Sequence, residues 1–299
     1  MTDRITQSML STTLLADLQT ITDKLARTQG KLSSGKEIQK PSDDPFATAR
    51  ALQFRAELAS NKQYQSNVGE ASSWQDATDT ALSSIGDLVL RARDLVVQGA
   101  NDTLGPSGRA SIAAEIDQIV ESIKAAGNTQ YAGRYIFSGS LTTTAPYTPG
   151  GPDAYLGDAA SIYREIGPGV QVPLNVDGGS VIGDSATPGS LLATLKTISN
   201  DLKTNNGAAL QTTDLAAIDS AHDVVTTARA TVGARTNRLE TALGRLQQLE
   251  ESTTKLLSNT EDADMAQTLV DFSQQQAVYQ AALKAGAQIV QPSLMDFLR

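Results

Sequence analysis

The stretch that decides the fold is residues 215–257, LAAIDSAHDVVTTARATVGARTNRLETALGRLQQLEESTTKLL. Apolar or uncharged residues recur there at every seventh position: Ile218, Val225, Val232, Leu239, Leu246 and Thr253. A second series lies between them: Leu215, His222, Arg229, Thr236, Leu243 and Leu257. This alternation of three and four residues keeps one stripe of a helix facing a partner helix. The stretch therefore predicts a helix of more than forty residues that packs along another long helix.

Two helices with the same alternation are predicted in the amino-terminal part. The first covers about residues 7–33 and carries Leu14, Leu18, Ile21, Leu25, Thr28 and Leu32. The second starts at Pro45, because Asp44 is a good N-cap and proline is favoured at the first helical position. Its stripe is Trp74, Thr78, Ala81, Ile85, Leu88, Ala92, Leu95 and Gly99. No proline occurs between Pro45 and Pro106, so we expect one helix of roughly fifty residues, well above the usual length.

The central part changes in character. A turn cluster at residues 99–108 ends the long helix, and a shorter helix follows, with isoleucines on one face and Gly127 near its end. Residues 133–190 hold 11 of the 23 glycines, 6 of the 10 prolines and no lysine. We expect no helix there but short strands at 135–137, 162–166 and 170–176. A short helix capped by Ser190 should then run to about Leu202.

A last helix is predicted after the acidic residues 261–264, which suit a helix amino terminus. Its stripe is Met265, Leu269, Phe272, Gln276, Tyr279, Leu283, Gly286 and Val290, and it should end at about Pro292. The order of elements is nearly mirror-symmetric about residues 133–190. The predicted fold class is mainly α: an elongated rod of long antiparallel coiled-coil-like helices from both chain ends, with a small inserted β subdomain at the tip.

Three domains follow from this order. Residues 1–44 plus 261–299 should form a terminal coiled-coil domain for assembly. Residues 45–134 plus 190–260 should form a helical rod domain, and residues 135–189 a small β-rich outer domain.

Composition excludes several classes of protein. The 24 Lys and Arg against 33 Asp and Glu give a net charge of −9, without a basic cluster, so neither nucleic acid nor a membrane surface is expected as a partner. The absence of cysteine excludes disulfides, thiolate nucleophiles and Cys-ligated metal centres. The first residues lack the features of a cleaved signal, and no run is long and apolar enough to span a membrane.

No site for catalysis, a cofactor or a metal is predicted. The single histidine, His222, falls on the apolar seam, where a polar residue more often sets register than binds metal. Asp262 and Asp264 lack the other features of a calcium loop and favour helix capping. An enzyme displayed in the β segment is a weak alternative, since its acids are scattered: Asp153, Asp158, Glu165, Asp177 and Asp184.

The two ends carry apolar stripes that a single helix pair would bury poorly. In the last helix most polar positions are Gln, so several of its sides could be packed without burying ions. We predict an assembly seam formed by Leu14, Leu18, Ile21, Leu25, Leu32, Leu269, Phe272, Tyr279, Leu283 and Val290. The alternative is an ordinary intramolecular bundle, and periodicity alone does not separate the two.

Residues 30–36 (GKLSSGK) with 41–45 (PSDDP) resemble the amino-terminal signature of bacterial flagellins and flagellin-like hook-associated proteins. Residues 232–240 (VGARTNRLE) resemble that family's carboxy-terminal helix motif. The likeness covers both helical arms, about 1–134 and 190–299. Within the family, residues 133–140, 262–266, 274–277 and 291–298 resemble the hook–filament junction branch, the third hook-associated proteins, more than the filament subunits.

The resemblance implies a non-catalytic structural role in the bacterial flagellum, as an adaptor that joins hook to filament outside the cell. It implies export through the flagellar channel without a cleaved signal. The implied partners are further copies of the chain, a neighbouring hook-associated protein, flagellin, and the flagellar export chaperone and export apparatus. The terminal helices would form the inner layer of a hollow assembly and the β segment its outer surface. The alternative within the family is a flagellin that forms the filament itself.

Overall fold

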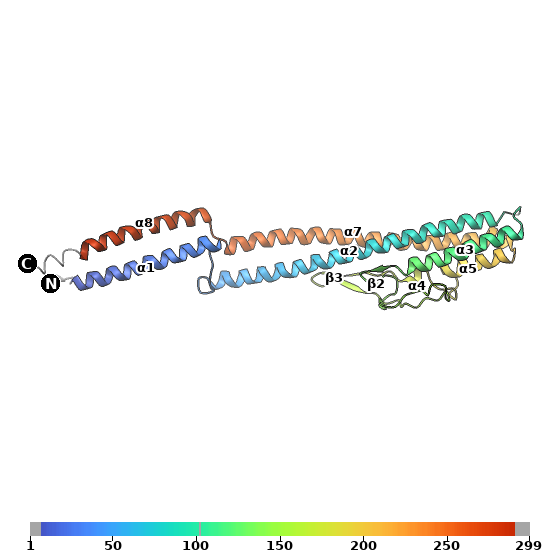
Figure 1. Cartoon of the computed structure of the whole chain (residues 1–299), viewed down its shortest axis with the longest axis horizontal. Coiled ribbons are helices and arrows are strands. Elements are labelled where there is room, and N and C mark those ends of the chain that lie inside the picture. Colours follow the sequence, from blue (N-terminus) through green and yellow to red (C-terminus); the bar gives the residue numbers. More distant parts are fainter. Residues whose placement is uncertain (1–6, 102, 291–299) are drawn as a thin grey trace, which may run out of the picture. The chain divides into compact units, whose positions relative to one another are not determined.

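The structure is a computed structural model that describes residues 7–101 and 103–290 and divides into two compact units (Figure 1). One unit combines residues 1–60 with 249–299, and the other consists of residues 61–248. The longer helices are α1 (Gln7–Ser34), α2 (Pro45–Gly99), α3 (Pro106–Gly127), α5 (Leu191–Lys203), α7 (Leu215–Glu261) and α8 (Met265–Val290). The mainly α class and the long helices are therefore confirmed. Pro292, where the last helix was expected to end, lies outside the described residues.

Three helix starts follow the predicted capping residues. The backbone N–H of Ala47 donates to Oδ1 of Asp44 at 2.9 Å, and that of Ala193 donates to Oγ of Ser190 at 3.2 Å. At the start of α8, the N–H of Ala266 donates to Oδ1 of Asp264 at 2.9 Å. Each cap satisfies a backbone donor that the first turn of a helix leaves free.

Helices α2 and α7 pair antiparallel in the unit formed by residues 61–248. Asn61 Nδ2 donates to the carbonyl of Leu246 at 2.9 Å, Arg229 Nε to Asp79 at 3.0 Å, and Arg93 Nε to Asp219 at 2.6 Å. The partner's number falls on α7 as it rises on α2, which defines the antiparallel register. The heptad residues of α7 from Ile218 to Leu246 are at most 3% exposed, so the predicted seam is confirmed.

A second helix pair, α3 with α5, lies on this seam. Its apolar faces belong to the same core as α2 and α7. Close packing depends on Gly99 at the end of α2, since a Cβ there would lie 2.5 Å from Leu202 Cδ2 on α5. Glycine at this position therefore lets the end of α2 approach α5.

The segment between α3 and α5 contains two small antiparallel sheets. One pairs β1 (Gln130–Tyr131) with β2 (Arg134–Tyr135), and the other pairs β3 (Tyr163–Gly167) with β4 (Val170–Pro173). The strand expected at 135–137 ends at Tyr135, because Ile136 and Phe137 turn into the core and are fully buried. The strand expected at 170–176 ends at Pro173. Beyond it, the Asn175 side chain accepts from the Ile162 N–H and donates to the Ala160 carbonyl, both at 2.8 Å.

The expectation that residues 133–190 contain no helix was wrong for one turn, α4 (Gly178–Val181). Asp177 caps it by accepting from the N–H of Gly179 at 2.9 Å. A capping carboxylate can hold a single turn even in a glycine-rich context.

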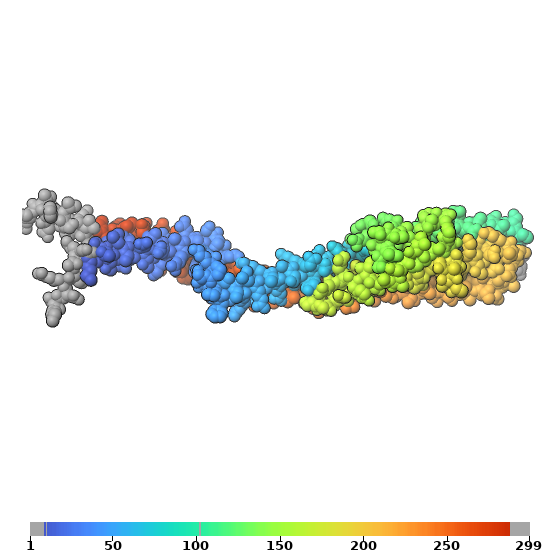
Figure 2. Space-filling view, turned by 90° about the horizontal axis from the view of Figure 1, so that it is seen from below, coloured from blue at the N-terminus to red at the C-terminus, as the bar shows by residue number. Residues whose placement is uncertain are grey.

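The β segment was expected at the tip of the hairpin, but it lies along the side of the helices in its unit (Figure 2). The side chains of Asn67 and Gln75 in α2 each donate at 2.8 Å to a backbone carbonyl of the segment. From α7, Arg235 donates to the carbonyl of Asn175 at 3.0 Å. The segment lies here because Ile166, Val172 and Leu174 are buried in the core of the unit, which covers apolar surface of the helices.

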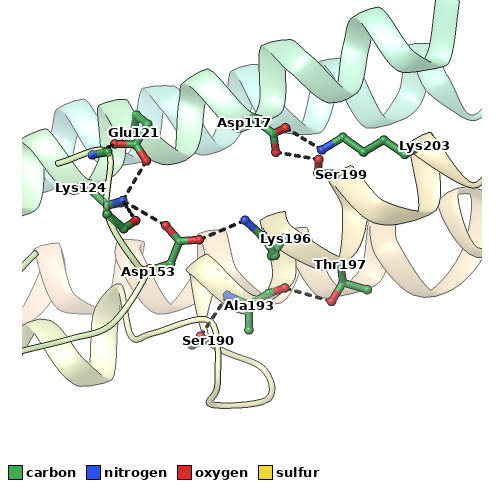
Figure 3. A network of polar contacts seen from close by, with 12 residues as sticks. Asp117, Glu121, Lys124, Asp153, Ser190, Ala193, Lys196, Thr197, Ser199 and Lys203 are labelled. Atoms are coloured by element: carbon green, nitrogen blue, oxygen red, sulfur yellow. Dashed lines mark hydrogen bonds and ion pairs between the residues drawn. The ribbon is translucent and has the colours of Figure 1, made fainter. Parts of the chain in front are cut away.

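A network of charged residues ties this segment to α3 and α5 (Figure 3). Lys124 on α3 has a fully buried side chain, and its Nζ lies 2.8 Å from Glu121 and 3.1 Å from Asp153. Burial alone would lower the pKa of Lys124, but the hydrogen bonds and charges of Glu121 and Asp153 raise it above its ordinary value. Asp153 also pairs with Lys196 of α5 at 3.3 Å. The cation is therefore held charged between two acids.

Two short helical turns precede α7: α6 (Gly207–Ala209) and the π-helical turn η1 (Leu210–Asp214). Asp214 is 4% exposed, and its Oδ2 has no hydrogen-bond partner. Burial, together with the nearby Asp201 of α5, raises the pKa of Asp214 to about 6. In the folded state the Asp214 carboxyl therefore stays neutral up to about pH 6.

We expect the Asp214→Asn substitution to remove a pH dependence of stability. Because the folded-state pKa lies above the ordinary value of 3.8, Asp214 stabilises the fold at low pH, and this contribution is lost as pH rises through about 6. Wild type should lose about 1.4 kcal/mol more than the variant between pH 5 and pH 8 in urea unfolding. Asp223→Asn, at an exposed acid of α7, is the control that should behave as wild type. Equal pH dependence in Asp214→Asn and wild type would contradict the assignment.

No helix among the described residues is both long enough and apolar enough to cross a membrane.

Candidate assembly surface

Helices α1 and α8 pair antiparallel in the unit made from the two chain ends. Thr28 Oγ1 donates to Gln275 Oε1 at 2.8 Å. Closer to the ends, Leu14 packs so tightly on Gly286 that a Cβ there would lie 2.8 Å from Leu14 Cδ2. The pair is thus held by a polar contact at Thr28 and by close packing of Leu14 on Gly286.

The predicted seam residues whose side chains are described differ in exposure, and they form a partly buried group and an exposed group. Partly buried on this helix pair are Leu14, Leu18, Ile21, Leu25, Leu32, Phe272 and Tyr279. Leu269 is 57% exposed and Leu283 is 46% exposed. The side chain of Val290 lies outside the described part of the chain. The pair of helices thus leaves two of its predicted seam leucines open to solvent.

The described residues of the terminal unit form no apolar core of their own. Among its described side chains, Ala51 is the only buried hydrophobic residue, whereas every other buried hydrophobic residue of the described chain lies between Val68 and Leu246. In the described part of this unit, eleven large hydrophobic residues are exposed: Met9, Leu15, Phe46, Leu52, Leu249, Leu256, Met265, Leu269, Val270, Val278 and Leu283. These exposed apolar residues are the candidates for an interaction surface.

A polar joint connects residues 35–37, which follow α1, with residues 261–263, which precede α8. The N–H of Glu37 donates to the carbonyl of Glu261 at 2.8 Å, and the N–H of Ala263 donates to the carbonyl of Gly35 at 2.9 Å. The Glu261 carboxylate, 9% exposed, accepts from Lys36 Nζ at 2.6 Å and also from Arg55. Beside this joint lies a pocket of about 540 Å³, whose lining includes Ile38, Pro41, Ala51, Leu52, Arg55 and Glu261.

Substituting Glu261 by Gln should loosen this joint, because two cations lose their shared carboxylate. Charge-assisted hydrogen bonds of this kind contribute about 1.5–3 kcal/mol. A loss of this free energy makes local opening about tenfold or more frequent, so we expect amide exchange at residues 35–37 and 261–263 to rise by that factor. Residues 61–248 should keep their protection against exchange. Glu251→Gln, which breaks an exposed pair with Lys255, is the matched control and should change little. Unchanged exchange at the joint in Glu261→Gln would contradict this role.

The residues that the sequence analysis considered as possible metal ligands lie in helix caps or on a helix face. Asp264 caps α8, as expected. Asp262 accepts from Ser258 Oγ at 2.6 Å, and His222 is partly buried on α7. Among the described residues, no cluster of three or more His, Cys, Asp or Glu has the arrangement of a metal site.

Sequence reasoning missed several exposed residues, of which Phe46 is the clearest at 87% exposure. Phe46 directly follows Pro45 in the first turn of α2. It does not belong to the apolar stripes from which the seam residues are predicted. Its signal was an isolated aromatic residue in a chain with only 4% aromatics.

Comparison with known proteins identifies the family. Residues 5–142 match the bacterial flagellin N-terminal helical region, and residues 215–298 match the bacterial flagellin C-terminal helical region. The chain belongs to the bacterial flagellin family. The two matches cover α1 to α3 and α7 to α8, so most of the β segment and α5 lie outside them.

Relatives of this flagellin-family chain include both hook-associated and filament proteins. It is 29% identical over 280 residues to flagellar hook-associated protein 3 of Escherichia coli K12, which covers 85% of this chain and 87% of the relative. It is 27% identical to the flagellar filament 30.7 kDa core protein of Treponema maltophilum, with 86% of each chain covered. These names are those of flagellar proteins, not of enzymes.

The fold also matches a solved structure from the family. A flagellar hook-associated protein of Vibrio parahaemolyticus superposes with a TM-score of 0.67 at 25% identity, which covers 74% of this chain and all of that one. The predicted family is thus confirmed in sequence and in fold.

Proposed function

We propose that this chain is a non-catalytic structural subunit of the bacterial flagellum that joins hook to filament. The observation that carries the proposal is the terminal unit: among its described residues, eleven large hydrophobic side chains are exposed and Ala51 is the only buried hydrophobic one. Such a unit requires a protein partner for stable packing. The likeness to hook-associated protein 3 of E. coli supports the junction as the place of assembly.

The proposal includes a three-layer organisation. Residues 1–44 with 261–299 form the inner assembly domain through the seam from Leu14 to Val290. Residues 45–134 with 190–260 form the helical middle layer, and residues 135–189 form the outer domain. Burial of Leu269 and Leu283 between copies would remove their apolar surface from water.

The partners in this proposal are further copies of the chain, a neighbouring hook-associated protein on one side and flagellin on the other. The chain reaches the outside of the cell through the flagellar export apparatus, with an export chaperone and without a cleaved signal. These steps rest on the likeness to flagellar relatives.

Deletion of the gene tests the proposal. Cells without it should build hooks but shed flagellin into the medium, and the wild-type gene should restore filaments. Normal filaments in the deleted strain would overturn the junction role.

A filament subunit is the second candidate, supported by the 27% identity to a Treponema filament core protein. Seeded polymerisation separates the two. Purified chain added to short filament seeds should not elongate them if it is a junction subunit, whereas growth to micrometre filaments would favour the flagellin alternative.

A further inference from the structure

A pocket in the second unit lies between the β3–β4 hairpin and α7. Its volume is about 460 Å³, and Ile166, Val170 and Ala242 contribute its apolar lining. Arg238 and Arg245, one on each side of Ala242 along α7, also line it. Both arginines are exposed, and neither guanidinium group has an ion pair or hydrogen bond with another described residue. The pocket therefore combines an apolar centre with two available guanidinium groups.

Helix α2 carries a stripe with the complementary pattern. Leu90 is 45% exposed and Val97 is 50% exposed, although both lie on a helix whose opposite face is buried. Asp87 and Asp94 flank Leu90 on the same face and are exposed. Within the described chain the carboxylates of these two acids form no hydrogen bond or ion pair. Arg229 and Arg93, on whose pKa these acids act, are already bonded to Asp79 and Asp219. Arg91, on the same face of α2, is bonded to Glu115 of α3.

The spacing of the two surfaces matches in one register. Asp87 lies three residues before Leu90 and Asp94 four residues after it. On α7, read in the opposite direction, Arg245 is three residues from Ala242 and Arg238 is four. In an antiparallel pairing, Leu90 therefore faces the pocket while both acids face both arginines.

We propose that the Asp87–Leu90–Asp94 stripe of one copy docks into the Arg238–Arg245 pocket of a second copy. This contact rests on the proposed function, because it presupposes that several copies of the chain assemble. Both of its surfaces belong to the unit formed by residues 61–248. Leu90 supplies the apolar anchor, and the two acid–arginine pairs set the register and exclude like-charged alternatives.

The geometry of this contact is that of a polymer rather than a closed dimer. Since α2 and α7 are antiparallel within one copy, a second α2 placed antiparallel to α7 points in the same direction as the first α2. The two copies are thus parallel. Leu90 lies about 25 residues along α2 from the level of Ala242, so each copy is displaced by about 37 Å along the helix direction. A contact between two different surfaces continues to a ring or a helix.

Disulfide cross-linking tests the contact directly, because the chain contains no cysteine. Chains with Asp94→Cys are mixed with chains with Arg238→Cys and oxidised, leaving Asp87 and Arg245 in place. We expect a disulfide-linked dimer of the two variants. A bond within one chain is excluded, because each variant carries a single cysteine.

Asp76→Cys provides the matched control for register. It is exposed on the same face of α2 as Asp94 but lies about 27 Å along the helix. Mixed with Arg238→Cys, it should give at least about fivefold less dimer than Asp94→Cys does. In the proposed register position 76 lies too far from position 238 for a disulfide bond. Equal yields for Asp76→Cys and Asp94→Cys, or dimers of Asp94→Cys with itself as the main product, would overturn the contact.

Charge reversal gives a second test in cells. Asp87→Lys with Asp94→Lys, and separately Arg238→Glu with Arg245→Glu, should each weaken junction formation by placing like charges together. Expressing both variants in one cell should restore it, because each surface then meets an opposite charge on the other variant. Full motility of each variant alone would overturn the contact while leaving the junction role intact. Normal filaments in the deleted strain would remove the junction role but not the cross-link in purified protein.

Discussion

Leu283→Asp should abolish incorporation of the chain into the flagellar junction without changing the stability of residues 61–248. Leu283 is 46% exposed in the chain by itself, so a carboxylate there stays hydrated before assembly. Once neighbouring copies cover it, the charge loses water and gains no partner, at a cost of about 3–5 kcal/mol per subunit. The measurement is the amount of chain retained on purified hooks, together with the melting temperature of the free protein.

Two controls define this result. Gln280→Asp adds the same charge at an exposed polar position of α8 and should have a much smaller effect on incorporation. Amide exchange of the free wild-type chain should show weak protection in residues 7–33 and 265–290, because helices with one narrow apolar stripe are marginal in water. Strong protection there would mean a self-contained bundle, and normal incorporation of Leu283→Asp would contradict the seam.

Lys124→Met should destabilise residues 61–248 by about 3–5 kcal/mol, because Asp153 and Glu121 lose the cation between them. Asp153 is the more affected, since its side chain is only 11% exposed. The double variant Lys124→Met with Asp153→Leu should recover most of the loss, since an apolar pair can replace a buried ion pair. Urea unfolding of the full chain measures both changes.

Lys203→Met is the control for an exposed pair. Lys203 lies 2.7 Å from Asp117, and both side chains are at least 39% exposed, so its loss should cost less than about 1 kcal/mol. Equal losses for Lys203→Met and Lys124→Met would show that burial of Lys124 does not govern its contribution.

The long helices were predictable from local spacing alone. The heptad from Ile218 to Leu246 needs only a partner stripe to be buried, and residues such as Ile85 on α2 provide one. The helix starts were equally predictable, because the side chains of Asp44, Ser190 and Asp264 each accept a hydrogen bond from a backbone N–H within three residues.

The β segment and the polar network were not predictable in detail. Lys124 depends on Asp153, which is 29 residues away in sequence, and nothing in the local pattern pairs them. The turn at Gly178–Val181 forms against glycine propensity because Asp177 caps it. The exposed residues of the assembly surface, Phe46 above all, follow from which faces find no partner within the chain, a property of the whole fold.

The joining of residues 249–299 to residues 1–60 in one unit affects the order in which the chain folds. Thr28 and Gln275 are separated by 247 positions, and Lys36 and Glu261 by 225. Contacts so distant in sequence close a large loop and form late, whereas the contacts of α3 with α5 span far fewer residues. A chain that emerges amino terminus first therefore leaves α1 without its partner until almost the last residue is free. The terminal unit is complete only when the whole chain has arrived.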